Sequence, residues 1–180
     1  MKNLEIYIHI PFCVRKCEYC DFLSFPADDD AKLRYVKGLM AEMIFYGPLM
    51  KNYQVSSVYI GGGTPSSIDE QWIAALMEGV FDCFNVLPDA EISIECNPGT
   101  LSREKLLAYK DAGINRLSIG LQSANNDELK RLGRIHTFAQ LATNYEVARN
   151  VGFKNINVDL MSGLPDQSAS QYMATVNKII

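Results

Sequence analysis

The sequence lacks several features that would assign a protein class directly. No apolar run approaches the ~18 residues of a transmembrane helix. The first ten residues are not a signal peptide, because Glu5 and His9 interrupt the apolar stretch and no small-residue cleavage site follows. Lysine and arginine are scattered and the formal net charge is −4, which argues against a broad nucleic-acid surface. We therefore expect a cytoplasmic protein without a transmembrane segment or a nucleic-acid partner.

Cysteine is scarce but unevenly placed. The five cysteines are an odd number in a chain too long for a small disulfide scaffold, so paired disulfides are not expected. Three of them, Cys13, Cys17 and Cys20, follow an apolar strand-like segment directly. Thiolates this close in a loop can share an inorganic cluster. A four-iron cluster held by three thiolates keeps one iron open, as catalytic metal sites do.

A structural zinc site is the alternative for these cysteines. It requires a fourth cysteine or histidine at ligand spacing. Residues 21–95 contain only Cys83, and the next histidine is His136, so His9 upstream is the remaining candidate for a fourth ligand. Cys83 and Cys96 fall in an apolar helix and a strand, where buried thiols act as small hydrophobic side chains.

Strand-like and helix-like patterns alternate along the chain. Strands are expected at residues 4–10, 55–60, 91–96, 116–120 and 155–159, and helices at 32–45, 70–84, 103–112, 127–132, 138–150 and 168–180. Ser67 and Glu70 have the spacing of a capping box for the second helix. The alternation predicts an α/β fold with a parallel sheet, either barrel-like or doubly wound. The last helical pattern has no stop signal, so we interpret the sequence as the front part of a longer protein.

Polar residues and glycines gather where the expected strands end. Residues 61–65, Gly-Gly-Gly-Thr-Pro, follow the second strand, and Glu95, Gln122 and Asp159 follow or end later ones. Binding residues of parallel α/β folds collect at this edge of the sheet. The glycines fit either a tight turn or a backbone contact with a ligand. A carboxylate such as Glu95 fits either a surface turn or a ribose contact.

The cysteine motif and the glycine motif together resemble those of one family. Cys13-x3-Cys17-x-Tyr19-Cys20, preceded by Tyr-Ile-His-Ile-Pro-Phe at residues 7–12, is similar to the signature of radical S-adenosylmethionine (SAM) proteins. The Gly-Gly-Gly-Thr-Pro motif and the order of later segments resemble one branch, which contains oxygen-independent coproporphyrinogen III oxidase and the HemW-type heme chaperones. The resemblance covers essentially all 180 residues.

The resemblance implies a partial TIM-like barrel of the (βα)6 type, with about five βα units in a radical SAM core domain at residues 1–180 and no C-terminal HemW-like domain. It implies that Cys13, Cys17 and Cys20 bind a 4Fe-4S cluster and that SAM binds the open iron. An electron from the cluster would then cleave SAM to a 5′-deoxyadenosyl radical. The positions matching the family's SAM site are Tyr7, Tyr19, Gly62, Gly63, Thr64, Glu95, Gln122, Arg134 and Asp159.

Two departures separate the relatives within this branch. The oxidase has an additional cysteine where this chain has Phe22, and an N-terminal extension for which the position of Cys13 leaves no room. Both favour the HemW-like interpretation, which implies heme binding, delivery to an acceptor protein, and an electron donor such as flavodoxin or ferredoxin. One alternative is an enzyme that catalyses oxidative decarboxylation of coproporphyrinogen III or another SAM-radical reaction such as methylation. The other is a structural or electron-transfer metal protein indifferent to SAM.

Overall fold

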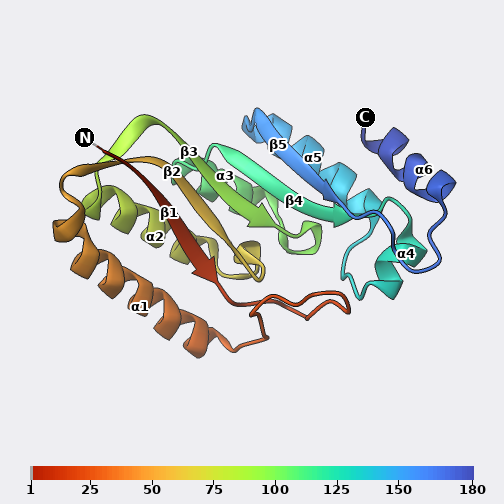
Figure 1. The fold of residues 1–180 in the computed structure, drawn as a ribbon, viewed down its shortest axis with the longest axis horizontal. Coiled ribbons are helices and arrows are strands. Elements are labelled where there is room, and N and C mark those ends of the chain that lie inside the picture. The colour runs from red at the N-terminus through yellow and green to blue at the C-terminus, as the bar shows by residue number, and fades with distance from the viewer. Residues whose placement is uncertain (1) are drawn as a thin grey trace.

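The computed structural model describes residues 2–180 and contains one sheet flanked by helices (Figure 1). The strands are β1 (Lys2–Ile10), β2 (Tyr53–Gly62), β3 (Val86–Cys96), β4 (Arg116–Gln122) and β5 (Asn155–Leu160). The helices are α1 (Asp29–Tyr46), α2 (Glu70–Cys83), α3 (Arg103–Asp111), α4 (Asn126–Arg131), α5 (Phe138–Val151) and α6 (Ala169–Ile179). Each strand and helix expected from the sequence is present. Within this described part, no helix is both long and apolar enough to cross a membrane.

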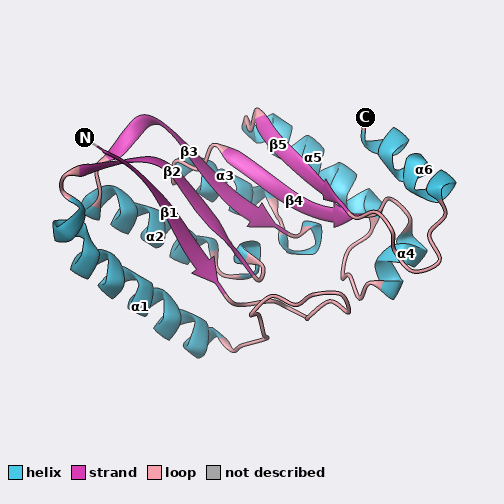
Figure 2. Ribbon diagram, viewed as in Figure 1, coloured by secondary structure: helices cyan, strands magenta, loops and turns pink. Residues whose placement is uncertain are grey.

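The strand order distinguishes the two expected architectures. The five strands lie side by side in sequence order, β1-β2-β3-β4-β5, and every neighbouring pair is parallel. A doubly wound sheet reverses its order at a switch point, and this sheet does not. Helices α1, α2, α3 and α5 neighbour one another in the same order and share one core with the sheet (Figure 2). The partial-barrel prediction is therefore confirmed.

The two faces of the sheet differ because alternate residues point in opposite directions. One face contributes Ile8, Ile60, Ile94 and Leu117, all buried in the core with the helices. The other face is polar. Its aligned residues in one cross-strand row are Tyr7, Tyr59, Ser93, Arg116 and Asn155. Burial of the apolar face against the helices stabilises the sheet, and the polar face can carry a binding site.

The start of α2 differs from the expected capping box. The N-cap residue is Asp69, whose Oδ1 accepts a hydrogen bond from the Gln71 N–H at 2.8 Å. Ser67 lies in a short 3-10 turn, and its hydroxyl donates to the Phe12 carbonyl at 3.3 Å. The capping-box interpretation of Ser67 and Glu70 was wrong, because Asp69 lies nearer the first unpaired N–H groups of the helix.

Leu117 offers a test of the shared core. It is completely buried in β4, whereas Leu49 is 60% exposed beyond α1. Leu117→Ala should lower the free energy of unfolding of the whole protein by about 2–5 kcal/mol, because a cavity forms between sheet and helices. Leu49→Ala should change it by less than about 0.5 kcal/mol. Urea unfolding of both variants measures the difference, and equal losses would contradict this packing.

Candidate metal and cofactor site

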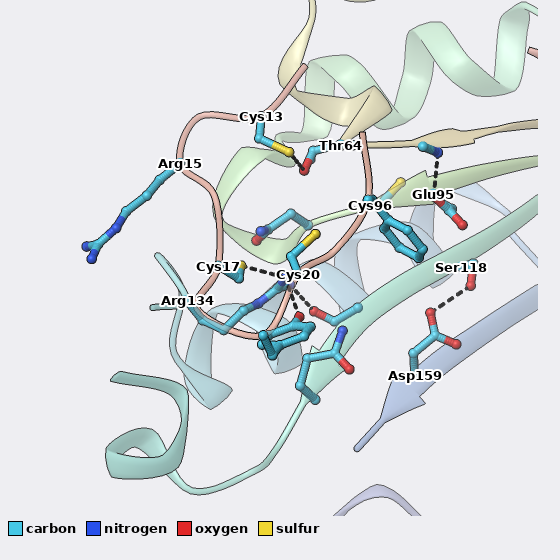
Figure 3. Close-up of a pocket in the computed structure, with 17 residues that line it drawn as sticks. Cys13, Arg15, Cys17, Cys20, Thr64, Glu95, Cys96, Ser118, Arg134 and Asp159 are labelled. Carbon is cyan, nitrogen blue, oxygen red and sulfur yellow. Dashed lines mark hydrogen bonds between the residues drawn. The ribbon is translucent and has the colours of Figure 1, made fainter. Parts of the chain in front are cut away.

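A pocket lies at the carboxyl ends of the strands, where the sequence predicts a site (Figure 3). Its walls are Cys13, Arg15, Cys17, Tyr19, Cys20, Phe22, Gly62, Gly63, Thr64, Glu95, Cys96, Asn97, Ser118, Gly120, Gln122, Arg134 and Asp159. All the predicted site residues except Tyr7 are in this set. The loop after β1 supplies the cysteines, and the ends of β2 to β5 supply most of the remainder.

The cysteine loop is attached to the glycine turn that follows β2. The Gly63 N–H donates to the Ile10 carbonyl and the Thr64 N–H to the Phe12 carbonyl, both at 2.8 Å. Gly63 permits this approach, since a Cβ there would lie 2.7 Å from the Phe12 oxygen and 3.0 Å from the Cys13 sulfur. The glycine turn therefore sets where the cysteine loop leaves the sheet.

The three loop cysteines line the pocket, and all three are free thiols. Cys13 is buried, and Cys17 and Cys20 are half-buried. The Thr64 hydroxyl donates to the Cys13 sulfur at 3.5 Å, and Arg134 Nη1 donates to the Cys17 sulfur at 3.7 Å. These thiols can ligate iron, and donors to two sulfurs supply the outer hydrogen bonds that metal thiolates use. The donor set therefore fits an iron–sulfur cluster.

The zinc alternative gains no support from His9. Its Nδ1 lies 3.2 Å from the Tyr7 hydroxyl and its Nε2 lies 3.4 Å from the Leu23 carbonyl, and His9 does not line the pocket. Among residues 2–180, no three cysteine, histidine or acidic side chains converge on a single-ion position. Zinc needs four ligands around one point, whereas a cluster binds its cysteines through separate irons.

Glu95 is held at the end of β3 by two donors. The Tyr59 hydroxyl donates to its Oε1 at 2.8 Å, and the Gly62 N–H donates to its Oε2 at 3.0 Å. Gly62 has a φ of +118°, and a Cβ there would meet the His9 ring at 2.7 Å. Burial and the hydrogen bond to Glu95 raise the pKa of Tyr59, so its hydroxyl remains a donor. The carboxylate is thus fixed in place beside the pocket.

Asp159 is positioned by two neighbours on the polar face. The Ser118 hydroxyl donates to its Oδ2 at 3.0 Å, and the Asn157 amide donates to its Oδ1 at 2.6 Å. Sequence reasoning did not select Ser118, although it alternates with Gly120 on β4 and so faces the same side. Gln122, at the end of β4, has a φ of 75°. A Cβ on Gly120 would lie 2.9 Å from the Gln122 amide nitrogen.

Arg134 reaches the pocket from the turn after α4. Its Nη2 donates to the Gly120 carbonyl at 2.5 Å and its Nη1 to the Tyr19 hydroxyl at 3.4 Å. Burial raises the pKa of Tyr19, and the nearby Arg134 charge opposes this rise. The guanidinium therefore connects the end of β4 with the cysteine loop.

The sequence also singled out Tyr7, Cys83 and Cys96, and only Tyr7 departs from its expected place. Tyr7 does not line the pocket: its side chain is 58% exposed and stacks on Tyr59, with ring centroids 6.1 Å apart. Cys96 lines the pocket but is buried, which raises its pKa and keeps the thiol protonated. Cys83 lies in α2, away from the pocket.

His136 joins the loops behind the pocket. Its Nδ1 lies 2.9 Å from Asn97 Oδ1 and its Nε2 lies 3.3 Å from the Leu121 carbonyl. Asn97 Oδ1 also accepts the Gly99 N–H, so both ring nitrogens face acceptors and a neutral ring can donate to only one of them. Burial, with the Arg134 charge adding to it, lowers the pKa of His136 from 6.5 to about 4, and the hydrogen bond to the Leu121 carbonyl opposes this shift.

Comparison with known proteins assigns this chain to a superfamily. The family profile described as "Radical SAM superfamily" matches residues 7–179, and the chain belongs to this superfamily.

Several relatives are similar to this chain along nearly its whole length. The chain is 39% identical to the heme chaperone HemW of Escherichia coli K12 over 98% of this chain and 47% of that protein. It is also 39% identical to the Bacillus subtilis HemW, over 95% of this chain and 45% of that protein. The coproporphyrinogen III oxidase HemN of Escherichia coli, described as a radical SAM enzyme, superposes with a TM-score of 0.91 at 31% identity. That match covers 99% of this chain and 41% of HemN. The chain spans about half the length of the curated relatives.

The lowered pKa of His136 predicts a pH-dependent stability. Because the folded pKa of about 4 lies below the ordinary 6.5, the neutral ring's contribution is fully present above pH 6.5 and is lost toward pH 4. We expect His136→Gln to remove on the order of 2–3 kcal/mol of this pH dependence in the free energy of unfolding. Urea unfolding between pH 7 and 4 tests this, with His9→Gln as the control. An unchanged slope in His136→Gln would contradict it.

Proposed function

We propose that Cys13, Cys17 and Cys20 bind a 4Fe-4S cluster and that the adjoining pocket binds SAM. Membership of the radical SAM superfamily and three free thiols around one pocket support this. When bound, such a cluster supplies the low-potential electron for reductive cleavage of SAM. The chain's own residues hold both groups at the carboxyl edge of the sheet.

The carboxylates of the pocket would orient SAM. Glu95 uses one lone pair on each oxygen for Tyr59 and Gly62, and the remaining ones can accept ribose hydroxyls. Gln122 would join it, and Asp159 and Arg134 would provide the further polar contacts of the SAM pocket. Tyr7 would support the SAM site indirectly, because its ring stacks on Tyr59, which donates to Glu95.

The glycine turn would contact SAM in a restricted way. The N–H groups of Gly62, Gly63 and Thr64 already donate to Glu95, Ile10 and Phe12. Contacts from this turn would therefore use carbonyl oxygens or the Thr64 hydroxyl, which suit an amino group rather than a carboxylate.

For the whole protein we propose heme binding and delivery to an acceptor protein. The observation that carries this is 39% identity to proteins named heme chaperones along nearly all of this chain. Phe22, at the position of the oxidase's additional cysteine, supports it. We further propose a cytoplasmic location, where the five free cysteines stay reduced, and a flavodoxin- or ferredoxin-type electron donor.

Oxidative decarboxylation of coproporphyrinogen III is the second candidate, favoured by the 0.91 TM-score to HemN. An oxidase must bring its polycarboxylate substrate to the SAM site, whereas a carried heme can bind elsewhere. The pocket carries two carboxylates, Glu95 and Asp159, and two guanidinium groups, Arg15 and Arg134, so its charge favours neither candidate. We rank the chaperone first on the 39% identity to HemW along nearly the whole of this chain.

The cluster assignment predicts different results for two cysteines. Cys17→Ala should lose the 4Fe-4S cluster, because two thiolates remain, while Cys83→Ala should keep the wild-type amount. Iron and sulfide analysis with electron paramagnetic resonance spectroscopy, after anaerobic reconstitution of the whole protein, measures this. Equal cluster loss in both variants would rule out the assignment.

The function assignment predicts heme transfer without decarboxylation. The whole cluster-loaded protein should bind heme under reducing conditions and release it to an apo heme protein. With reductant, SAM and coproporphyrinogen III, mass spectrometry should show no loss of carbon dioxide from the porphyrinogen, and HemN run in parallel is the positive control. Decarboxylation would establish the oxidase instead, and absence of heme binding would refute the chaperone.

A further inference from the structure

The three cluster cysteines have unequal surroundings. Cys17 receives a charged donor, the Arg134 guanidinium, with Nη1 3.7 Å from its sulfur. Cys13 receives a neutral donor, the Thr64 hydroxyl, at 3.5 Å. Within residues 2–180, the Cys20 sulfur has no hydrogen-bond donor. The loop therefore presents one thiolate to a fixed positive charge and two to weaker or no polar contacts (Figure 3).

The Arg134 guanidinium is held in this place from several sides. Its Nη2 donates to the Gly120 carbonyl, and its Nη1 also donates to the Tyr19 hydroxyl. The Arg134 N–H donates to the Leu129 carbonyl at 2.9 Å, which fixes the turn after α4. The Glu18 N–H donates to the Leu132 carbonyl at 3.1 Å, so the same turn is attached to the cysteine loop. The guanidinium is thus built into the loop's surroundings rather than free in solvent.

We propose that Arg134 is a positioning residue that raises the reduction potential of the cluster by donating a hydrogen bond to the Cys17 thiolate. This inference rests on the proposed cluster at Cys13, Cys17 and Cys20. It assigns Arg134 a role toward the cluster that is separate from contact with SAM.

The direction of the effect follows from charge. Reduction adds one electron to a group already bound by three thiolates, so the reduced state is the more negative one. A cation with an N–H directed at a ligand sulfur stabilises that state more than the oxidised one. Hydrogen bonds to the sulfurs and local charge are the terms by which proteins set cluster potentials. Loss of the guanidinium should therefore make the cluster harder to reduce.

The test is a redox titration of the reconstituted whole protein without SAM, followed by electron paramagnetic resonance. The midpoint potential of Arg134→Met should shift to a more negative value than wild type. Arg134→Lys, which keeps the charge but loses the planar donor, should lie between the two. Arg15→Met is the matched control: Arg15 lines the same pocket, pairs with Glu18 at 3.8 Å and bonds no cysteine, so its potential should stay near wild type.

Other outcomes would overturn the inference. A wild-type potential in Arg134→Met, with weakened SAM binding alone, would make Arg134 a SAM contact only. Equal shifts in Arg134→Met and Arg15→Met would assign the effect to charge at a distance instead of the hydrogen bond. Failure of both Arg134 variants to load a cluster that Arg15→Met does load would make Arg134 an assembly residue. A wild-type protein that loads no cluster would instead refute the proposed function itself.

Discussion

The site depends on two backbone hydrogen bonds, from the N–H groups of Gly63 and Thr64 to the carbonyls of Ile10 and Phe12. They join the turn after β2 to the segment after β1, and they exist because Gly63 has no Cβ to collide with Phe12 and Cys13. With them in place, the cysteine loop passes over the ends of β2 to β4 instead of extending away from the sheet. The thiols then face the same space as Glu95 and Arg134, and the pocket becomes possible.

The sheet has one apolar face and one polar face, and this division is the second condition for the site. The apolar face is buried under four helices and supplies the stability, so the polar face is free to carry hydroxyls, amides and carboxylates. On that face the polar groups bind one another: Tyr59 holds Glu95, and Ser118 and Asn157 hold Asp159. Fixed carboxylates lose little side-chain entropy when a ligand arrives, which is how a rigid strand end serves a binding site better than a loose loop.

Much of this was predictable from the sequence. The alternation of strands and helices gave the parallel sheet, and the rule that ligands bind at carboxyl ends of strands brought residues 13–20, 62–64, 95, 122 and 159 together. Pattern alone left the barrel and the doubly wound sheet open, because strand order is set by tertiary packing. It could not place Tyr7, since the periodicity gives a face but not the distance to the pocket. It also missed Asp69 as the cap of α2, where two candidate caps compete within three residues.

The contact between Arg134 and Cys17 spans 117 positions of the chain, and that between Thr64 and Cys13 spans 51. The chain is synthesised from its N-terminus, so the three thiols exist before the residues that donate hydrogen bonds to two of them. The Cys17 sulfur cannot receive its Arg134 hydrogen bond until the turn after α4 has been made. A site with its full set of sulfur contacts therefore requires almost all of residues 1–134, and a nascent chain that ends earlier offers bare thiols to a metal.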